Sequence, residues 1–185
     1  MAIDLAATLR RWKPDKRLHQ LRPRSETELL WVSDAPPTRL PVLLDTNVYI
    51  ADAAGRLPQA AEALLDRALI FHCSVCLAEL AVGIASGDPR HRDAPAIRDH
   101  YAELMGAIPA TRILVPNREA WIDAGILAGT LARIQGLQRH HRKDVLNDAL
   151  IFLTASHHGL PVLTSNRTDF DYLQQLAPSG IVYHY

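Results

Sequence analysis

Residues 41–50 read PVLLDTNVYI, and this stretch decides the fold because it joins an apolar run to a carboxylate. Val42, Leu43 and Leu44 are typical of a strand that is covered on both faces in a parallel sheet. We expect a strand over 42–45, with Asp45 at its carboxyl end. Ligands bind at that edge of open α/β sheets, so Asp45 is the first candidate functional residue.

The composition of the chain is that of an ordinary globular domain. It has 185 residues, of which 48% are hydrophobic and 22% charged. No apolar run approaches the roughly 18 residues that span a bilayer, and the amino terminus lacks the apolar core of a signal peptide. We therefore expect a cytoplasmic protein with no membrane segment. The formal net charge is zero, so an anionic partner must be attracted by local basic clusters.

Strand and helix patterns alternate along the rest of the chain. Strand-like segments lie at 69–73, 112–115, 161–164 and 181–185. Helical patterns lie at 58–69, at 75–84 behind a capping Ser74, before Ile108, at 118–136 behind a capping Asn117, at 144–159 and at 168–176. This alternation predicts a three-layer α/β/α domain with a mostly parallel central sheet.

Residues 1–40 differ from the rest because they are basic and rich in proline. One short helix is expected in IDLAATLRRW and a short strand or turn in ELLWV. We interpret residues 1–40 as an N-terminal extension to a domain over 41–185. The extension is expected to wrap the domain, to cover a partner site or to stay mobile.

Polar side chains are predicted to meet at one edge of this sheet. Asp45 ends the first strand, Glu79 lies just over one turn into its helix, and Asn166 and Asp169 follow the strand at 161–164. Asp148 lies near the start of a helix that must run antiparallel to the strands, which brings it to the same edge. Close carboxylates repel one another unless a cation neutralises them, and oxygen ligands favour magnesium or manganese.

Each of these residues also has a structural interpretation. Glu79 is equally compatible with a solvated helix face, Asp144 with a helix cap, and Asp169 with the cap of the last helix. Asp148 has apolar neighbours, which makes a purely structural role harder to defend.

The two cysteines, Cys73 and Cys76, form a lone C-x-x-C. That spacing suits a redox pair, and His72 beside it suggests a metal site. No second pair of ligands with zinc-finger spacing accompanies it, so we favour two small hydrophobic residues at a strand-to-helix junction.

Four segments carry a resemblance to a known family: LLDTNVYI, SVCLAELAVGI, NDALIFLTA and VLTSNRTDF. In this order they resemble the signature segments of PIN-domain ribonucleases, and most of all the VapC-type toxins of bacterial toxin-antitoxin pairs. The similarity spans roughly residues 41–185 and leaves the first 40 residues outside it.

The resemblance implies roles for individual residues. Asp45, Glu79 and Asp148 would be the catalytic acids that bind metal. Thr46 and Asn47 would shape the turn after Asp45 and, with Thr164, contact substrate. The last metal ligand would be Asn166 or Asp169. An amide at position 166 is a weaker ligand than a carboxylate and would lower the affinity for a second metal ion. The number of bound metal ions, one or two, therefore stays open.

The expected function is metal-dependent hydrolysis of RNA by an endoribonuclease that uses Mg²⁺ or Mn²⁺. The basic loop with Arg139, Arg142 and Lys143 would hold flanking phosphates, although a solvated surface segment is the alternative. The expected partners are single-stranded or structured RNA, with tRNA among the candidates, a small antitoxin protein and a second copy of the chain.

The residues around Asp45 argue against two other functions. A phosphatase of the haloacid dehalogenase type needs an aspartate where Asn47 stands, and a nucleotide-binding module needs a glycine-rich turn after Asp45. Two alternatives stay open. One is an RNA-processing or decay nuclease outside a toxin pair, and the other is a catalytically weak PIN-like module that binds RNA or protein.

Overall fold

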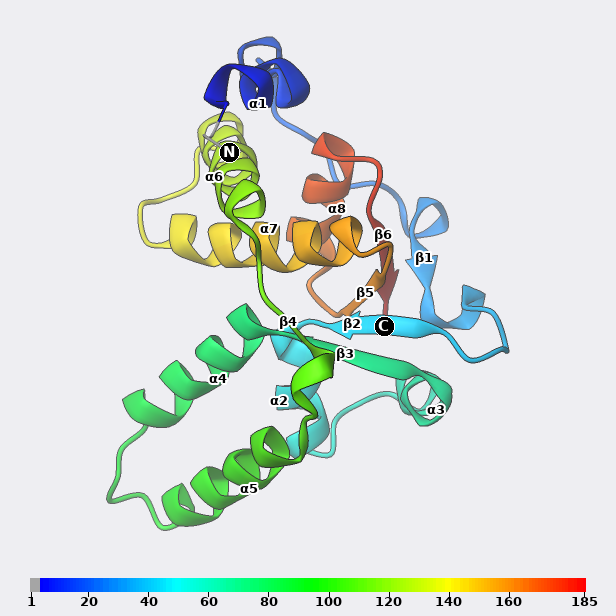
Figure 1. Ribbon diagram of the computed structural model, residues 1–185, viewed down its shortest axis with the longest axis vertical. Coiled ribbons are helices and arrows are strands. Elements are labelled where there is room, and N and C mark those ends of the chain that lie inside the picture. Colours follow the sequence, from blue (N-terminus) through cyan, green and yellow to red (C-terminus); the bar gives the residue numbers. More distant parts are fainter. Residues whose placement is uncertain (1–3) are drawn as a thin grey trace.

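The computed structural model describes residues 4–185, and its centre is a single sheet of six parallel strands (Figure 1). The strand order is β1-β6-β5-β2-β3-β4. The strands are β1 (Leu30–Trp31), β2 (Pro41–Leu44), β3 (Leu69–Cys73), β4 (Ile113–Leu114), β5 (Pro161–Thr164) and β6 (Ile181–His184). The predicted α/β class is confirmed, and every pairing in the sheet is parallel.

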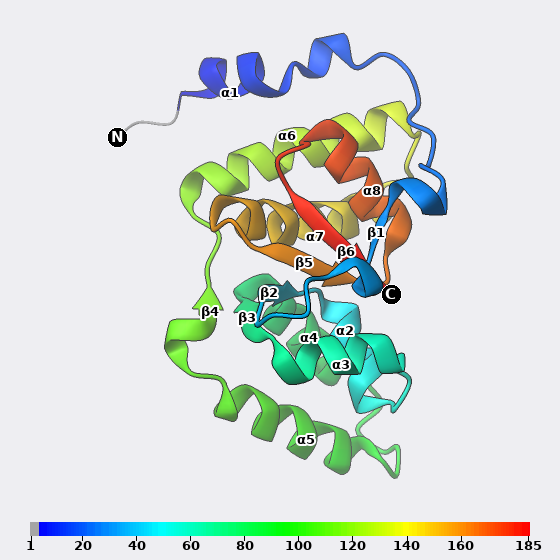
Figure 2. The ribbon, with the colours of Figure 1, turned by 90° about the vertical axis from the view of Figure 1, so that its right-hand side faces the viewer.

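Helices cover both faces of the sheet. They are α1 (Leu5–Trp12), α2 (Thr46–Ala53), α3 (Gln59–Arg67), α4 (Ser74–Ser86), α5 (Ala94–Ala107), α6 (Arg118–Ile134), α7 (His141–His157) and α8 (Arg167–Leu176). Short 3-10 helices lie at Pro14–Lys16, Glu26–Glu28, Val32–Asp34 and Ala110–Arg112. As Figures 1 and 2 show, α6, α7 and α8 lie on one side of the sheet and α2, α3, α4 and α5 on the other. The predicted three layers are therefore present.

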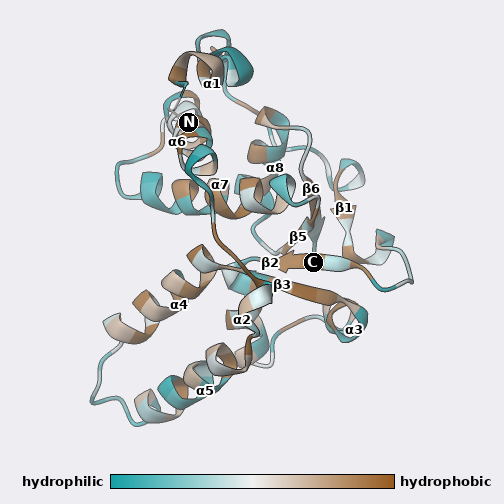
Figure 3. Ribbon diagram, in the orientation of Figure 1, coloured by the Kyte–Doolittle hydropathy of each residue, from teal (hydrophilic) through white to brown (hydrophobic). Residues whose placement is uncertain are grey.

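The core is built around β2 and α7. Val42, Leu43 and Leu44 are almost fully buried between the two helical layers, as their continuous apolar run requires. In α7, every residue from 149 to 155 is buried. Figure 3 shows this stretch in hydrophobic colours, whereas the first turn of α7 is hydrophilic.

The strand order places a crevice beside β2. The chain passes from β2 to β3 on one side, and it returns on the other side of β2 with β5. Leu44 pairs with Leu163, and the Asp45 backbone N–H donates to the Leu163 carbonyl at 3.1 Å. This is the switch point at which open α/β sheets bind ligands, and Asp45 lies directly in it.

Several predicted boundaries are wrong by a few residues. The strand predicted over 42–45 is β2, which ends at Leu44. Asp45 is the N-cap of a helix, α2, that was not predicted. Thr46 and Asn47 therefore lie in the first turn of a helix, because the Asp45 side chain satisfies a free backbone N–H and lets the helix begin at once. The cap of α4 is Cys73, and Ser74 is its first helical residue.

The start of α7 also differs from the prediction. The helix begins at His141, so Arg142 and Lys143 lie in its first turn rather than in a loop. The predicted strand at 112–115 is reduced to Ile113 and Leu114. Asn117 does cap α6, since its side chain accepts from the Ala120 backbone N–H at 2.7 Å.

Residues 4–40 pack along the rest of the chain, which is the first of the three expected arrangements. Helix α1 lies on α6, and β1 pairs with β6 at the edge of the sheet (Figure 2). Arg11 and Trp12 donate to the buried Asp123 at 2.9 and 2.7 Å. From residue 4 to the carboxyl terminus, no helix is long and apolar enough to cross a membrane.

Candidate active site

Asp45 is fixed by three neighbours at the end of β2. Its Oδ1 accepts from the Thr46 backbone N–H at 2.7 Å, and its Oδ2 accepts from the Asn47 amide and the Thr164 hydroxyl, both at 2.6 Å. Asp45 is 4% exposed and Thr164 is fully buried. The end of β2, the first turn of α2 and the end of β5 thus hold this carboxylate in one orientation.

Glu79 is held from two elements that are distant in sequence. Its Oε2 accepts from the Thr46 hydroxyl, and its Oε1 accepts from the Asn147 side chain at 2.7 Å. Thr46 therefore contacts both Asp45 and Glu79. Asn147 immediately precedes Asp148 on α7, so this bond ties α4 to the helix that carries the third acid.

Asn166 links the remaining acids. Its Nδ2 donates to Asp148 Oδ2 at 3.1 Å and to Asp169 Oδ2 at 3.0 Å, and its backbone N–H donates to the Thr164 hydroxyl at 2.9 Å. It is also the N-cap of α8, with Oδ1 accepting from the Asp169 backbone N–H. The structural interpretation of Asp169 as the cap of that helix is therefore wrong.

These contacts join the predicted acids and amides into one network at the carboxyl edge of β2 and β5. The network includes Asp45, Thr46, Asn47, Glu79, Asn147, Asp148, Thr164, Asn166 and Asp169. The fold therefore brings the acids together as the topology predicts, while their catalytic and metal-binding roles stay predictions.

The electrostatics of this edge favour the uncharged forms of two acids. Burial raises the pKa of Asp45 to about 6, and repulsion from Glu79 and Asp169 adds to this effect. Burial also raises the pKa of Asp148 well above its ordinary value, with further contributions from Asp45, Asp169 and Glu79. The neighbouring acids thus add to the cost of ionising Asp45 and Asp148, a cost that a bound cation would lower.

The donor set suits a hard divalent cation. Carboxylate and amide oxygens are the ligands that Mg²⁺ and Mn²⁺ prefer, and the Asn166 amide already places a positively polarised group between Asp148 and Asp169. Across residues 4–185, no three Asp, Glu, His or Cys side chains are close enough to form a preformed metal site. A bound cation would therefore have to replace some of the present hydrogen bonds.

The predicted basic residues are distributed unevenly around the acids. Lys143 lines a cavity together with Glu79 and Asn147. Arg139 and Arg142 are exposed, and in the described part of the chain no hydrogen bond or ion pair joins them to the acids. Of the three, Lys143 is the one placed beside the candidate site.

Two residues at this edge were not predicted from the sequence as site residues. Trp121 of α6 lines the same cavity as Lys143 and is 50% exposed. The Tyr185 hydroxyl donates to Asn47 Oδ1 at 3.3 Å. Neither residue lies in one of the four signature segments. The only signal for Trp121 was a large aromatic residue on a helix whose apolar positions are otherwise small or aliphatic.

The C-x-x-C lies next to this network but has the features of core residues. Cys73 and Cys76 are fully buried and have free thiols. The Cys76 thiol donates to the Leu44 carbonyl at 3.3 Å, directly before Asp45. Their position at the junction of β3 and α4 agrees with the preferred interpretation as small hydrophobic residues.

Comparisons with known proteins agree with this geometry. The PIN domain model matches residues 42–175. Among solved structures, VapBC-5 of the VapBC family of toxin-antitoxin systems from Mycobacterium tuberculosis is 27% identical, with a TM-score of 0.55 over 78% of this chain and 98% of that chain.

Two further structures share the fold at lower identity. FitAcB from Neisseria gonorrhoeae is 22% identical, with a TM-score of 0.56 over 77% of this chain and 96% of that chain. VapBC2 from Rickettsia felis, bound to a DNA fragment from its promoter, is 19% identical, with a TM-score of 0.53 over 79% and 99%. No curated protein matches the chain. Because the domain model covers most of its 185 residues, the chain belongs to the PIN domain family.

Proposed function

We propose that this chain is a divalent-metal-dependent endoribonuclease. The observation that carries the proposal is the single hydrogen-bond network in which Asp45, Glu79 and Asp148 reach the sheet edge from three separate elements. Membership of the PIN domain family supports a nuclease. The RNA substrate and the metal dependence are part of the proposal.

The residues of the network would have two roles, metal binding and orientation of the carboxylates. Asp45, Glu79 and Asp148 would hold one or two Mg²⁺ or Mn²⁺ ions, with Asn166 or Asp169 as a further ligand. When bound, such an ion supplies the positive charge that activates a water molecule and neutralises the leaving oxygen of a phosphodiester. Thr46, Thr164 and Asn147 keep the carboxylates oriented, as their hydrogen bonds already do.

Basic side chains would hold the RNA on either side of the cut bond. Lys143 lies on the wall of the cavity that Glu79 also lines, so a phosphate bound there would be close to the acids. Arg139 and Arg142, exposed nearby in sequence, would contact phosphates further along the strand.

Cleavage of a mixed RNA pool tests this proposal. We expect cutting in Mg²⁺ or Mn²⁺, none in excess chelator, and recovery when the metal is restored. The control is a DNA oligonucleotide of the same sequences, which should be cut more slowly. RNA cleavage that continues undiminished in chelator would contradict the metal-dependent mechanism.

We also propose that the nuclease is the toxin of a toxin-antitoxin pair and acts in the cytoplasm as a homodimer. The likeness to VapBC-5, a member of a family of toxin-antitoxin systems, supports the toxin role. Expression of the chain alone should arrest growth, and an Asp148→Asn variant should not. Copurification tests for a small antitoxin protein, and light scattering of the purified chain tests for the homodimer. Unimpaired growth together with RNA cleavage would instead favour a processing or decay nuclease.

A further inference from the structure

A cavity of about 550 Å³ opens next to the acidic network, between α4, α6 and α7. Its lining comprises Ser74, Val75, Ala78, Glu79, Val82, Gly83, Trp121, Lys143, Asp144 and Asn147. The volume lies within the range of about 300–1,000 Å³ that is usual for small-ligand pockets.

The α4 wall of the cavity continues directly into the acidic network. Val75, Ala78, Val82 and Gly83 share one face of the helix with Glu79, at the spacing that places helix side chains side by side. Glu79 is thus the single acid on an otherwise apolar face. A group seated against this wall lies immediately beside a residue of the proposed catalytic centre.

The α6 wall is an aromatic surface exposed to solvent. Trp121 is 50% exposed, although a side chain of this size is usually well buried. Indole faces stack on nucleobases of any sequence, and exposed aromatic residues are the usual platforms for single-stranded nucleic acids.

The α7 wall carries charges of both signs and a shared contact. Lys143 and Asp144 lie in the first turn, and Asn147 donates to Glu79 at 2.7 Å. The cavity therefore combines an apolar wall, an aromatic face and a cation, and it opens beside the acids. This combination matches the base and the phosphate of one nucleotide.

We propose that this cavity binds the base of the nucleotide next to the cut phosphodiester, with Trp121 as the stacking platform and Lys143 contacting a phosphate. The inference rests on the proposed ribonuclease function and adds the place where a substrate base is held. Glu79 itself lines the cavity, so a phosphodiester bound at Glu79 has its neighbouring base within reach of Trp121, which favours RNA over a protein segment as the occupant.

The first test measures binding without cleavage. In an Asp45→Asn background with Mg²⁺, a ten-nucleotide single-stranded RNA of mixed sequence should quench tryptophan fluorescence. The quenching should disappear in Trp121→Phe, because Trp12 and Trp31 lie outside the cavity lining. Trp121→Leu should weaken RNA binding about 10- to 100-fold, the usual range for one lost stacking contact. The matched control is Val115→Ala, which removes an exposed apolar side chain outside the cavity and should change nothing.

The second test uses cleavage of paired RNAs that differ by one abasic nucleotide. The parent should cut the RNA that lacks the base next to the mapped cut site more slowly than the intact RNA. The loss of rate should be about as large as the loss that Trp121→Leu causes with the intact RNA. The two changes together should have no further effect, since they remove the same contact. Fully multiplicative effects would overturn the proposal.

Other outcomes separate the two proposals. Metal-dependent cleavage with unchanged Trp121 fluorescence on RNA binding would overturn the base site and leave the nuclease standing. Failure to bind or cut any RNA would overturn both. A fluorescence that changes with protein concentration alone and ignores RNA would assign this surface to a protein contact and overturn the base site.

Discussion

Asp45 combines a structural and an electrostatic task in one side chain. Its carboxylate caps α2 and accepts from Thr164 and Asn47, so the fold holds it tightly. The same burial raises its pKa to about 6, which means that keeping the charge at neutral pH costs stability. A residue that is retained at such a cost is expected to serve a function.

Substituting Asp45 with asparagine should separate these tasks. Asparagine keeps the capping ability and removes the charge. In chelator near pH 7.5, we expect Asp45→Asn to melt above the parent, and Mg²⁺ to stabilise the parent more than the variant. Thermal unfolding with and without metal measures both effects. A lower melting temperature together with an equal gain from Mg²⁺ would identify Asp45 as a structural residue.

The pH dependence of metal-free stability follows from the same shift. The folded-state pKa of Asp45 is about 6, and that of an unfolded aspartate is about 3.9. The folded protein therefore binds more protons in this interval. The contribution of the Asp45 carboxyl group to the free energy of unfolding is fully present below about pH 3.9. It is lost as the pH rises through about 6, and the total loss is about 3 kcal/mol.

Urea unfolding of the parent and of Asp45→Asn in chelator measures this contribution. Between about pH 4.5 and 7.5, the free energy of unfolding of the parent should fall relative to that of the variant. The difference between the two proteins cancels the titration of shared groups. A constant difference across this range would contradict the pKa assigned to Asp45.

At the scale of elements, the first turn of α7 opposes ordinary helix electrostatics. Arg142 and Lys143 place positive charge at a helix N-terminus, where the dipole favours negative charge. Replacing both residues with alanine should therefore not lower the free energy of unfolding. If they contact phosphates, the double alanine variant should bind RNA more weakly, and the slope of log affinity against log salt should shrink by about 1.4.

Filter binding at several salt concentrations tests this prediction. Arg39→Ala is the control, because this exposed arginine precedes β2 at the opposite end of the sheet. The control should keep the salt slope of the parent. Equal slopes for the double variant and the parent would make this turn a solvated helix end.

The sequence predicted which elements form better than it predicted where they begin. Short apolar runs located β2, β3 and β5, and Asn117 located the start of α6, because those signals are local. Helix α2 was missed because TNVYIADA lacks a helical apolar stripe, and its formation depends on the cap from Asp45. The convergence of the acids followed from topology, but the bridging position of Asn166 depends on side-chain geometry that sequence does not encode locally.

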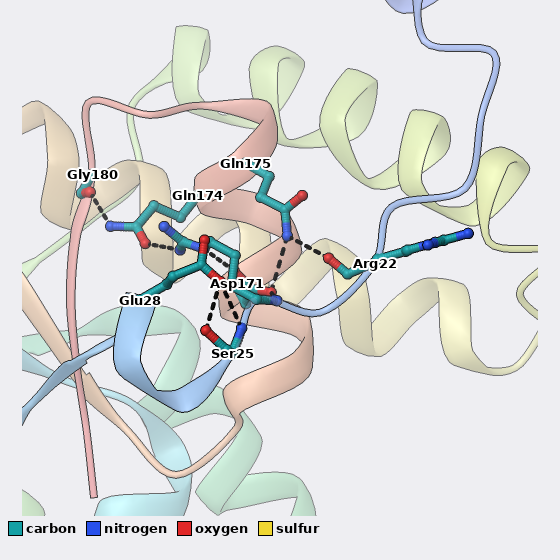
Figure 4. A network of polar contacts seen from close by, with 8 residues as sticks. Arg22, Ser25, Glu28, Asp171, Gln174, Gln175 and Gly180 are labelled. Carbon is teal, nitrogen blue, oxygen red and sulfur yellow. Dashed lines mark hydrogen bonds and ion pairs between the residues drawn. The ribbon is translucent and has the colours of Figure 1, made fainter.

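At the scale of the whole molecule, the extension is bound through ion pairs from partly exposed arginines to buried aspartates. Arg24 donates through Nε to Asp171 at 2.5 Å and also contacts Gln174, and its backbone N–H donates to Asp171 at 2.9 Å. Figure 4 shows Gln175 joining Arg22 to Asp171. The partners lie about 150 residues apart, so no local pattern in the sequence announced the contact.

Breaking this pair should destabilise the whole domain. Asp171 is 2% exposed, so Arg24→Ala leaves a buried charge without its partner and should cost about 3–5 kcal/mol in the free energy of unfolding. Arg10→Ala removes an exposed arginine 4.0 Å from Asp4 and should cost less than about 1 kcal/mol. Urea unfolding compares them. Equal losses would mean that the extension is only loosely attached.

The central claim is that the acids at the edge of β2 and β5 form the catalytic centre. It is tested most directly by the rate of RNA cleavage in Mg²⁺ for the parent, Asp148→Asn and Asp66→Asn. Both variants remove one negative charge, but Asp148 belongs to the network with Asn166, whereas Asp66 is an exposed residue of α3 outside the network and the cavity. We predict that Asp148→Asn loses cleavage by at least about 100-fold and that Asp66→Asn stays close to the parent. Equal rates for Asp148→Asn and the parent would contradict the account.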